Sequence, residues 1–208
     1  MLVTDSGASD LYVSSLPRQF CFFCFASRQW LPKRRAECCR SATNAGWKAS
    51  KRGDGRQGRG FAFAKYKNLA VWCAVIADVE VDPATGVVRV PKLWAVADAG
   101  MIVNPDGFAN QIEGGCIQST SWTLRESVSY DTTRILTRSW SDYPILRVAE
   151  VPLVDVKLID RPDERPLGVG EGSQGPTVAA IANGFANATG KRLRDLPFTP
   201  ERVKAALG

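Results

Sequence analysis

One acidic side chain in this sequence lies where a general base could be held. Glu171 is the only acid in the glycine-rich run at residues 168–176, and a helix is expected to begin just after it. Glycine permits close backbone approach, so such a loop can hold a carboxylate against a ligand. An acid in a Gly/Pro/Ser stretch is usually a solvated turn residue, so composition alone favours that interpretation.

The absence of histidine restricts the possible chemistry. The 208-residue chain has no histidine, which excludes Ser-His-Asp catalysis and imidazole-based metal sites. A general base must therefore be a carboxylate, Lys, Tyr or Cys. Cys21 and Cys24 have the CxxC spacing, and Cys38 with Cys39 could complete a thiolate set. Because the first pair is embedded in Phe-rich sequence and the second is vicinal, we predict no metal site.

The positive charge is confined to the N-terminal part. Residues 1–60 carry 11 Lys/Arg and 4 Asp/Glu, a net +7, whereas residues 61–208 carry 16 and 17, a net −1. Residues 1–57 show no sustained periodicity, so we predict an irregular basic segment, disordered or unrelated to the rest, followed by a domain at residues 58–208. Nucleic-acid binding through residues 28–59 is the least favoured function, because basic runs are usually solvated charge.

No segment predicts membrane insertion. No run approaches the ~18 apolar residues that span a bilayer, and the apolar cluster at residues 20–26 is too short. Asp5 and Asp10 precede that cluster where a signal peptide would be basic. We therefore expect no membrane contact, with the cytoplasm as the default location and the periplasm still open.

The remaining sequence predicts a mixture of strands and helices. A β-branched run at residues 70–81, a turn cluster at 82–86 and a second run at 87–97 predict a β-hairpin. Further short strands are expected at residues 127–130, 135–140 and 154–159, and a loop or linker at 48–59. We therefore expect an α+β fold, in which a β-hairpin and a mixed sheet are packed against helices.

The helices are indicated by their capping residues. Asn104 and Pro105 predict a helix start, with the helix continuing to about Leu124. A second helix is expected at residues 176–189, ending at Gly190, and a third at 199–207. Gly114 and Gly115 lie inside the first helix, where each glycine costs about 1 kcal/mol against alanine, so they are expected to admit a ligand or another backbone.

Several motifs resemble those of one enzyme family. They are ADAGMIVNP at 97–105, NQIEGG at 110–115, SDYP at 141–144, GVGE at 168–171 and PTVAAIAN at 176–183. Together they resemble the C-terminal part of the molybdopterin-binding large subunit of the xanthine dehydrogenase and aldehyde oxidase family. The similarity is greatest to the isoquinoline 1-oxidoreductase β-subunit, and it covers about residues 58–206.

The resemblance implies a reaction, a cofactor and a site. Members of this family hydroxylate aldehydes or N-heterocycles, with water as the oxygen source, at molybdenum held by molybdopterin. Glu171 matches the glutamate that accepts a proton, and burial can raise the pKa of such a base toward neutrality. The residues implied to contact the cofactor are Gln111, Gly114, Gly115, Gly170, Ser173 and Gln174.

The resemblance also implies missing parts. A family large subunit runs to several hundred residues, so we expect a truncated or frame-shifted product that is inactive alone and does not retain molybdopterin by itself. The implied partners are the rest of the large subunit and an iron–sulfur small subunit, with a small molecule as substrate. The alternative is a non-catalytic protein-interaction module derived from the same domain.

Overall fold

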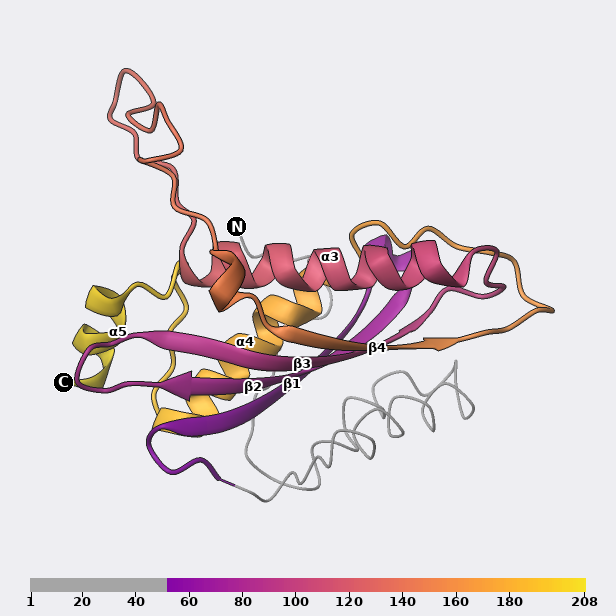
Figure 1. The fold of residues 1–208 in the computed structure, drawn as a ribbon, viewed down its shortest axis with the longest axis horizontal. Helices are drawn as coiled ribbons and strands as arrows, with labels where there is room; N and C mark the ends of the chain where they lie inside the picture. Colours follow the sequence, from indigo (N-terminus) through magenta and orange to yellow (C-terminus); the bar gives the residue numbers. More distant parts are fainter. Residues whose placement is uncertain (1–51) are drawn as a thin grey trace.

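The computed structural model describes residues 52–208, which form one sheet with helices packed against it (Figure 1). The strands are β1 (Gln57–Lys65), β2 (Trp72–Val81), β3 (Val88–Asp98) and β4 (Leu153–Ile159). The helices are α3 (Pro105–Leu124), α4 (Gln174–Thr189) and α5 (Pro200–Leu207), with short 3-10 helices η1 (Tyr66–Asn68) and η2 (Val148–Glu150). The predictions made for residues 1–51, including the four N-terminal cysteines, lie outside the described residues.

The sheet is mixed, as predicted. The strand order is β1-β2-β3-β4, and the first two pairings are antiparallel. β4 is parallel to β3, starting with Leu153 opposite Lys92. A parallel pairing needs a long crossover, and the chain between β3 and β4 supplies it with α3 and the residues that follow. The α+β fold with a hairpin and packed helices is therefore confirmed.

One face of the sheet carries the core. Alternate side chains of β2, including Cys73, Val75 and Ala77, are fully buried, as expected for a pleated strand covered on that face. They join one apolar cluster with Ile112 of α3 and Phe185 of α4. This packing fixes α3 and α4 relative to the strands, and so positions the loops at their ends.

The contact between β1 and α4 is a backbone contact. A Cβ atom added at Gly60 would overlap the carbonyl oxygen of Ala180 and the amide nitrogen of Gly184. Gly184 in turn lies against the side chain of Val79. The Asn183 side chain donates to the Phe61 carbonyl at 2.9 Å, which joins helix and strand by a hydrogen bond as well. Glycine is therefore needed here for close approach rather than for its backbone freedom.

The hairpin turn is held by Asp82. Its carboxylate accepts from the Ala84 amide at 3.0 Å and from the Thr85 hydroxyl at 2.6 Å, and these bonds lower the pKa of Asp82. Gly86, with φ at 76°, donates its amide to the Asp82 carbonyl at 2.7 Å. A left-handed φ favours glycine at this position. The predicted turn at residues 82–86 is thus confirmed.

The capping signals also predicted the helices well. Asn104 caps α3 by accepting from the Gly107 amide at 2.9 Å, with Pro105 as the first helical residue. Gly190 ends α4 with a left-handed φ of 73°. Thr199 caps α5 by accepting from the Arg202 amide at 3.4 Å. Only the start of α4 differs, because the helix begins at Gln174, two residues before the predicted proline.

The α3 cap should contribute measurably to stability. Replacing Asn104 with alanine leaves the Gly107 amide without its side-chain acceptor, so Asn104→Ala is expected to lower the free energy of unfolding by about 1 kcal/mol. Urea unfolding of the full chain, followed by circular dichroism, measures the change. Asn104→Asp keeps an acceptor and should stay within about 0.5 kcal/mol of the parent. Equal losses in both variants would contradict a capping role.

Two predicted strands are wrong. Residues 127–147 form an arm that projects away from the sheet and helices (Figure 1), and its only bridge pairs Tyr130 with Ile135. The Asp131 carboxylate organises the turn of this arm by accepting from the Thr133 amide at 2.7 Å. The apolar residues that suggested strands are exposed instead, Trp140 by 80%. Apart from that single bridge, these residues have no neighbouring strand within residues 52–208. Residues with high β-propensity form strands only where a partner strand and packing neighbours stabilise them.

The sequence also failed to predict β1. The loop expected at residues 48–59 gives way to a strand, because β1 begins at Gln57. The chain contacts α4 even earlier, because the Gly53 amide donates to the Asn187 carbonyl at 3.2 Å and the Gly55 amide donates to the Ala188 carbonyl at 2.9 Å. Glycine has low β-propensity, so the sequence of β1 does not by itself predict a strand. The strand forms because β1 pairs with β2 and its glycines pack against α4.

Candidate functional site

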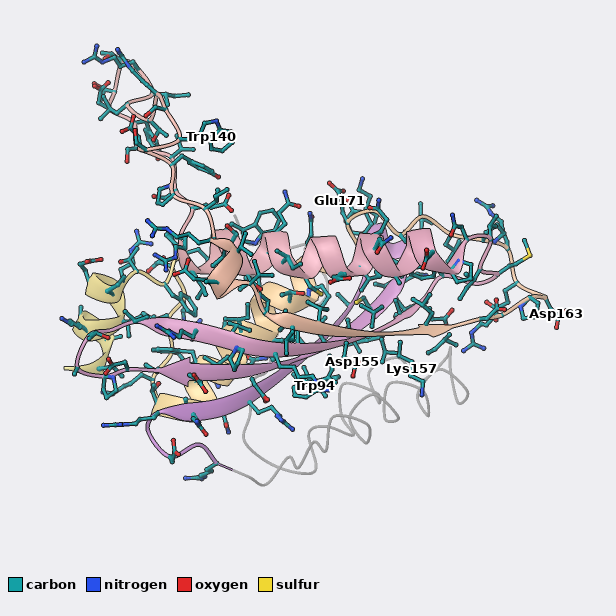
Figure 2. All side chains as sticks on the ribbon, viewed as in Figure 1. Trp94, Trp140, Asp155, Lys157, Asp163 and Glu171 are labelled. Carbon is teal, nitrogen blue, oxygen red and sulfur yellow. The ribbon has the colours of Figure 1, made fainter. Side chains whose placement is uncertain are left out.

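Glu171 lies on the loop that leads into α4, beside α3 (Figure 2). The loop is fixed at both ends of its glycine run. The Val71 amide donates to the Gly168 carbonyl at 3.2 Å, and Gly172 packs so closely on the Val71 side chain that a Cβ atom would overlap it. A turn follows, in which the Gln174 amide donates to the Glu171 carbonyl at 3.3 Å. Gly172 therefore serves close packing within the protein, whereas no atom lies within 4 Å of a Cβ position at Gly168 or Gly175.

The carboxylate of Glu171 is exposed and has one hydrogen-bond donor among the described residues. Tyr66 of η1 donates its hydroxyl to Oε2. Oε1 is thus left as an acceptor at the surface. Sequence reasoning missed Tyr66, because 105 residues separate it from Glu171 and nothing local marks the pairing.

One glycine of α3, Gly115, packs against this loop. Gln111, Gly114 and Gly115 are three and four residues apart, so they share one side of the helix. A Cβ atom at Gly170 would lie 3.9 Å from Gln111 Oε1, which brings the loop to the exposed Gln111 amide. Gly114 is exposed, and no atom lies within 4 Å of where its Cβ would be. The tertiary structure therefore brings together residues that the sequence separates by more than 50 positions.

Ser173 and Gln174 have different environments. The buried Ser173 hydroxyl donates to the Ile112 carbonyl at 2.9 Å and occupies the space where Gly115 would carry a Cβ, so it joins α4 to α3. The half-buried Gln174 amide donates to Gln118 Oε1 at 2.9 Å. Gln118 lies four residues after Gly114 and seven after Gln111. That helical spacing could have added it to the candidate site.

Beneath these residues lies a buried thiol. Cys116 accepts a hydrogen bond from Thr177 Oγ1 at 3.3 Å, and burial raises the pKa of Cys116 above its usual range. A raised pKa leaves less thiolate, the reactive form, near neutral pH. The thiol therefore serves packing between α3 and α4.

Alkylation can test this assignment. Cys116, together with the equally buried Cys73, is expected to resist iodoacetamide at pH 8 in the folded chain and to react once urea is added. Mass spectrometry of tryptic peptides measures labelling at each position. Labelling of Cys116 in the native chain at the rate of a free cysteine peptide would show that the thiol is accessible.

An ion pair and two backbone hydrogen bonds hold the segment that precedes the Glu171 loop. Arg161, after β4, donates Nε to Asp98 Oδ2 at 2.8 Å, and the two side chains are 16% and 6% exposed. Backbone bonds accompany it, from the Arg161 amide to the Gly100 carbonyl at 3.2 Å and from the Leu167 amide to the Ala99 carbonyl at 2.8 Å. The segment before Glu171 is thereby attached to the end of β3.

Removing one charge of this pair should destabilise the protein. Asp98→Asn removes the nearer of two carboxylates beside the mostly buried Arg161 guanidinium, the other being Glu164 with Oε1 3.8 Å from Nη1, so we expect a loss of about 2 kcal/mol in the free energy of unfolding. Urea unfolding measures it. Asp155→Asn is the matched control, because Asp155 is exposed on β4 (Figure 2) and should change stability by less than about 0.5 kcal/mol. Equal effects would rule out the ion pair as the cause.

Metal-binding clusters and membrane spans are both absent from the described residues. No group of three or more His, Cys, Asp or Glu side chains in residues 52–208 is placed to hold a metal ion. None of the helices in the same range combines the length and apolar character needed to cross a membrane.

Comparison with known proteins identifies the family. Residues 33–152, more than half of the chain, match the family model of the molybdopterin cofactor-binding domain. The chain belongs to this family. The match begins at residue 33, inside the segment that sequence analysis separated from the domain, and it extends to the start of β4.

Individual members of the family agree with this assignment. A nicotinate dehydrogenase subunit from Pseudomonas putida is 48% identical over 162 residues, covering 75% of this chain and 14% of that protein. The β-subunit of isoquinoline 1-oxidoreductase from Brevundimonas diminuta is 35% identical, covering 68% and 18%. Quinoline 2-oxidoreductase from Pseudomonas putida 86 has a TM-score of 0.62 at 29% identity, covering 66% and 18%. The predicted resemblance is confirmed, and the chain spans less than a fifth of these relatives.

The exposed groups beside Glu171 are chemically suited to molybdopterin. An amide such as Gln111 offers two donors and one acceptor to a pterin ring. The open space over Gly114 would be filled by any larger side chain, so the helix surface can be approached closely there. These residues would form one wall of a cofactor site.

Proposed function

We propose that this chain forms part of the cofactor site of a molybdenum hydroxylase large subunit, with Glu171 as its general base. The observation that supports the proposal most directly is the contact between the loop of the exposed Glu171 and α3, where Gly170 lies beside the exposed Gln111. The bound cofactor would supply the molybdenum centre at which aldehydes or N-heterocycles are hydroxylated with oxygen from water. The 48% identity to a nicotinate dehydrogenase subunit favours N-heterocycles.

Each candidate residue has a role that its position allows. Glu171 accepts a proton at Oε1, because Oε2 already accepts the Tyr66 hydroxyl. Gln111 and Gln174 direct amide groups to the cofactor, while the exposed Gly114 and Gly170 allow its close approach. Gly115 makes room for Ser173 instead. Ser173 acts through its bond to the Ile112 carbonyl, which sets where the loop lies.

The proposed activity needs further protein. The relatives are subunits several times longer than this chain, so the remaining walls of the cofactor and substrate cavities would come from the rest of a large subunit. An iron–sulfur subunit would remove the electrons. On this proposal the 208-residue chain neither retains molybdopterin nor turns over a substrate by itself.

A segment exchange tests the proposal. Residues 58–208 replace the corresponding segment of the Pseudomonas putida nicotinate dehydrogenase relative, and the chimera is produced in a host that makes molybdopterin. We expect stoichiometric molybdenum and nicotinate oxidation in the chimera, and no molybdenum in the purified 208-residue chain. A folded chimera without molybdenum would refute the proposed site. Molybdenum bound stoichiometrically to the chain alone would refute the need for further protein.

One observation favours a second candidate, a non-catalytic interaction module. The projecting arm exposes several large apolar side chains, among them Tyr130 and Trp140. Exposed aromatic side chains are typical of protein interfaces. In such a module Glu171 would have no role, so Glu171→Gln would leave partner binding and any turnover of the chimera unchanged.

A further inference from the structure

We propose that Tyr66 is a positioning residue for Glu171, an inference that rests on the proposed function. The Tyr66 hydroxyl donates to Oε2 of the carboxylate, and no other donor to Glu171 is present among residues 52–208. A phenol O–H bound to an ionised carboxylate is a charge-assisted hydrogen bond, stronger than a neutral one. The bond therefore selects one orientation of an otherwise exposed side chain and leaves Oε1 as the acceptor.

Tyr66 is itself well fixed. Its amide donates to the Val71 carbonyl at 3.0 Å, and its carbonyl accepts from the amides of Leu69 and Ala70 at 3.3 and 3.0 Å. The half-buried ring packs against the apolar core. A rigid donor restricts its acceptor more than a mobile one does, because the entropy of ordering the pair is already partly lost.

The turn that carries Tyr66 also carries the Glu171 loop. Val71 accepts the Tyr66 amide through its carbonyl and donates its own amide to Gly168, three residues before Glu171. Gly172, directly after Glu171, packs on the Val71 side chain. Val71 thus contacts both the residue that donates the hydrogen bond, Tyr66, and the loop that carries the acceptor, Glu171. Their separation is determined by short backbone connections rather than by two independent loops.

The backbone beside Tyr66 adopts a rarely populated conformation. Lys67 has φ 49° and ψ 21°, and it is the only non-glycine residue with positive φ in the described part of the chain. Its Nζ lies 5.0 Å from the centre of the Tyr66 ring. Such conformations persist where surrounding contacts over-determine them, and they cluster at functional sites. A tight turn of this kind holds the ring where the hydroxyl reaches Glu171.

The expected consequence is a change in kcat rather than in KM. Tyr66→Phe keeps the packed ring and removes only the O–H group, so the loop should stay in place while the carboxylate gains rotational freedom. Misplaced catalytic groups react more slowly without binding substrate more weakly. In the nicotinate dehydrogenase chimera we expect kcat to fall roughly tenfold with KM unchanged.

The protein offers a matched control. Tyr143 donates its hydroxyl to Glu126 Oε2 at 2.7 Å, a second tyrosine–glutamate hydrogen bond, located at the base of the arm. Tyr143→Phe removes the same kind of bond away from α4. It should leave kcat of the chimera unchanged. If the loss of any buried or bonded tyrosine hydroxyl lowered activity, kcat would fall in both Tyr66→Phe and Tyr143→Phe.

A cofactor-free measurement complements the kinetics. In the full 208-residue chain with 13C-labelled glutamate, the carboxyl resonance of Glu171 is assigned by its absence in Glu171→Gln. We expect Tyr66→Phe to shift this resonance at constant pH and Tyr143→Phe to leave it in place. An unmoved Glu171 resonance, or an unchanged kcat in Tyr66→Phe, would overturn the positioning role alone. Full turnover in Glu171→Gln would overturn both this role and the proposed function.

Discussion

Glu171→Gln is expected to lower kcat of the nicotinate dehydrogenase chimera by about 10²- to 10⁴-fold, the usual contribution of a general base. Glutamine has nearly the same shape and can still accept the Tyr66 hydroxyl through its carbonyl oxygen. It cannot take up a proton in the reaction. Because the substituted side chain lies at the surface of its loop, the fold and the molybdenum content should not change. Steady-state kinetics together with metal analysis measure both quantities.

Glu126→Gln is the control for this substitution. Glu126 also accepts a tyrosine hydroxyl, at 2.7 Å from Tyr143, but it follows the end of α3 rather than the glycine-rich loop. We expect its kcat to stay within about twofold of the parent, since exposed substitutions away from a site have small effects. A Glu171→Gln chimera with full molybdenum and kcat within about threefold of the parent would show that another group accepts the proton.

Gly60→Ala should have the largest effect on stability, a loss of about 3 kcal/mol in the free energy of unfolding. The added methyl group would overlap the backbone of Ala180 and Gly184 and lie 2.8 Å from the Asn183 carbonyl carbon. Backbone atoms of a packed helix cannot rotate away as a side chain can. α4 would have to move off β1, which would also displace the Glu171 loop at its N-terminus.

A second glycine-to-alanine change should act in the opposite direction. Gly114 lies inside α3 with no atom within 4 Å of its Cβ position, so Gly114→Ala is expected to stabilise the chain by about 1 kcal/mol. Urea unfolding of both variants measures the two changes. Losses of similar size in both would mean that helix α3 is packed differently from the structure described. With glycine at position 114, that side of α3 stays open to close approach.

Much of this protein could be predicted from local sequence. Asn104 and Pro105 mark the start of α3, and Gly190 marks the end of α4, because capping chemistry acts within a few residues. The hairpin followed from two β-branched runs joined by a turn cluster. The motif around Glu171 and its order with the other motifs predicted the family, which the match to the molybdopterin cofactor-binding domain confirms.

The sequence by itself therefore determined the helices, the central hairpin, the family and the list of candidate site residues. The tertiary structure alone decided the strand β1, the projecting arm at residues 127–147 and the pairing of Tyr66 with Glu171. The reason is physical. Caps and turns are stabilised by neighbours in the chain, whereas an edge strand or a hydrogen bond between residues far apart in the sequence depends on groups that only packing brings together.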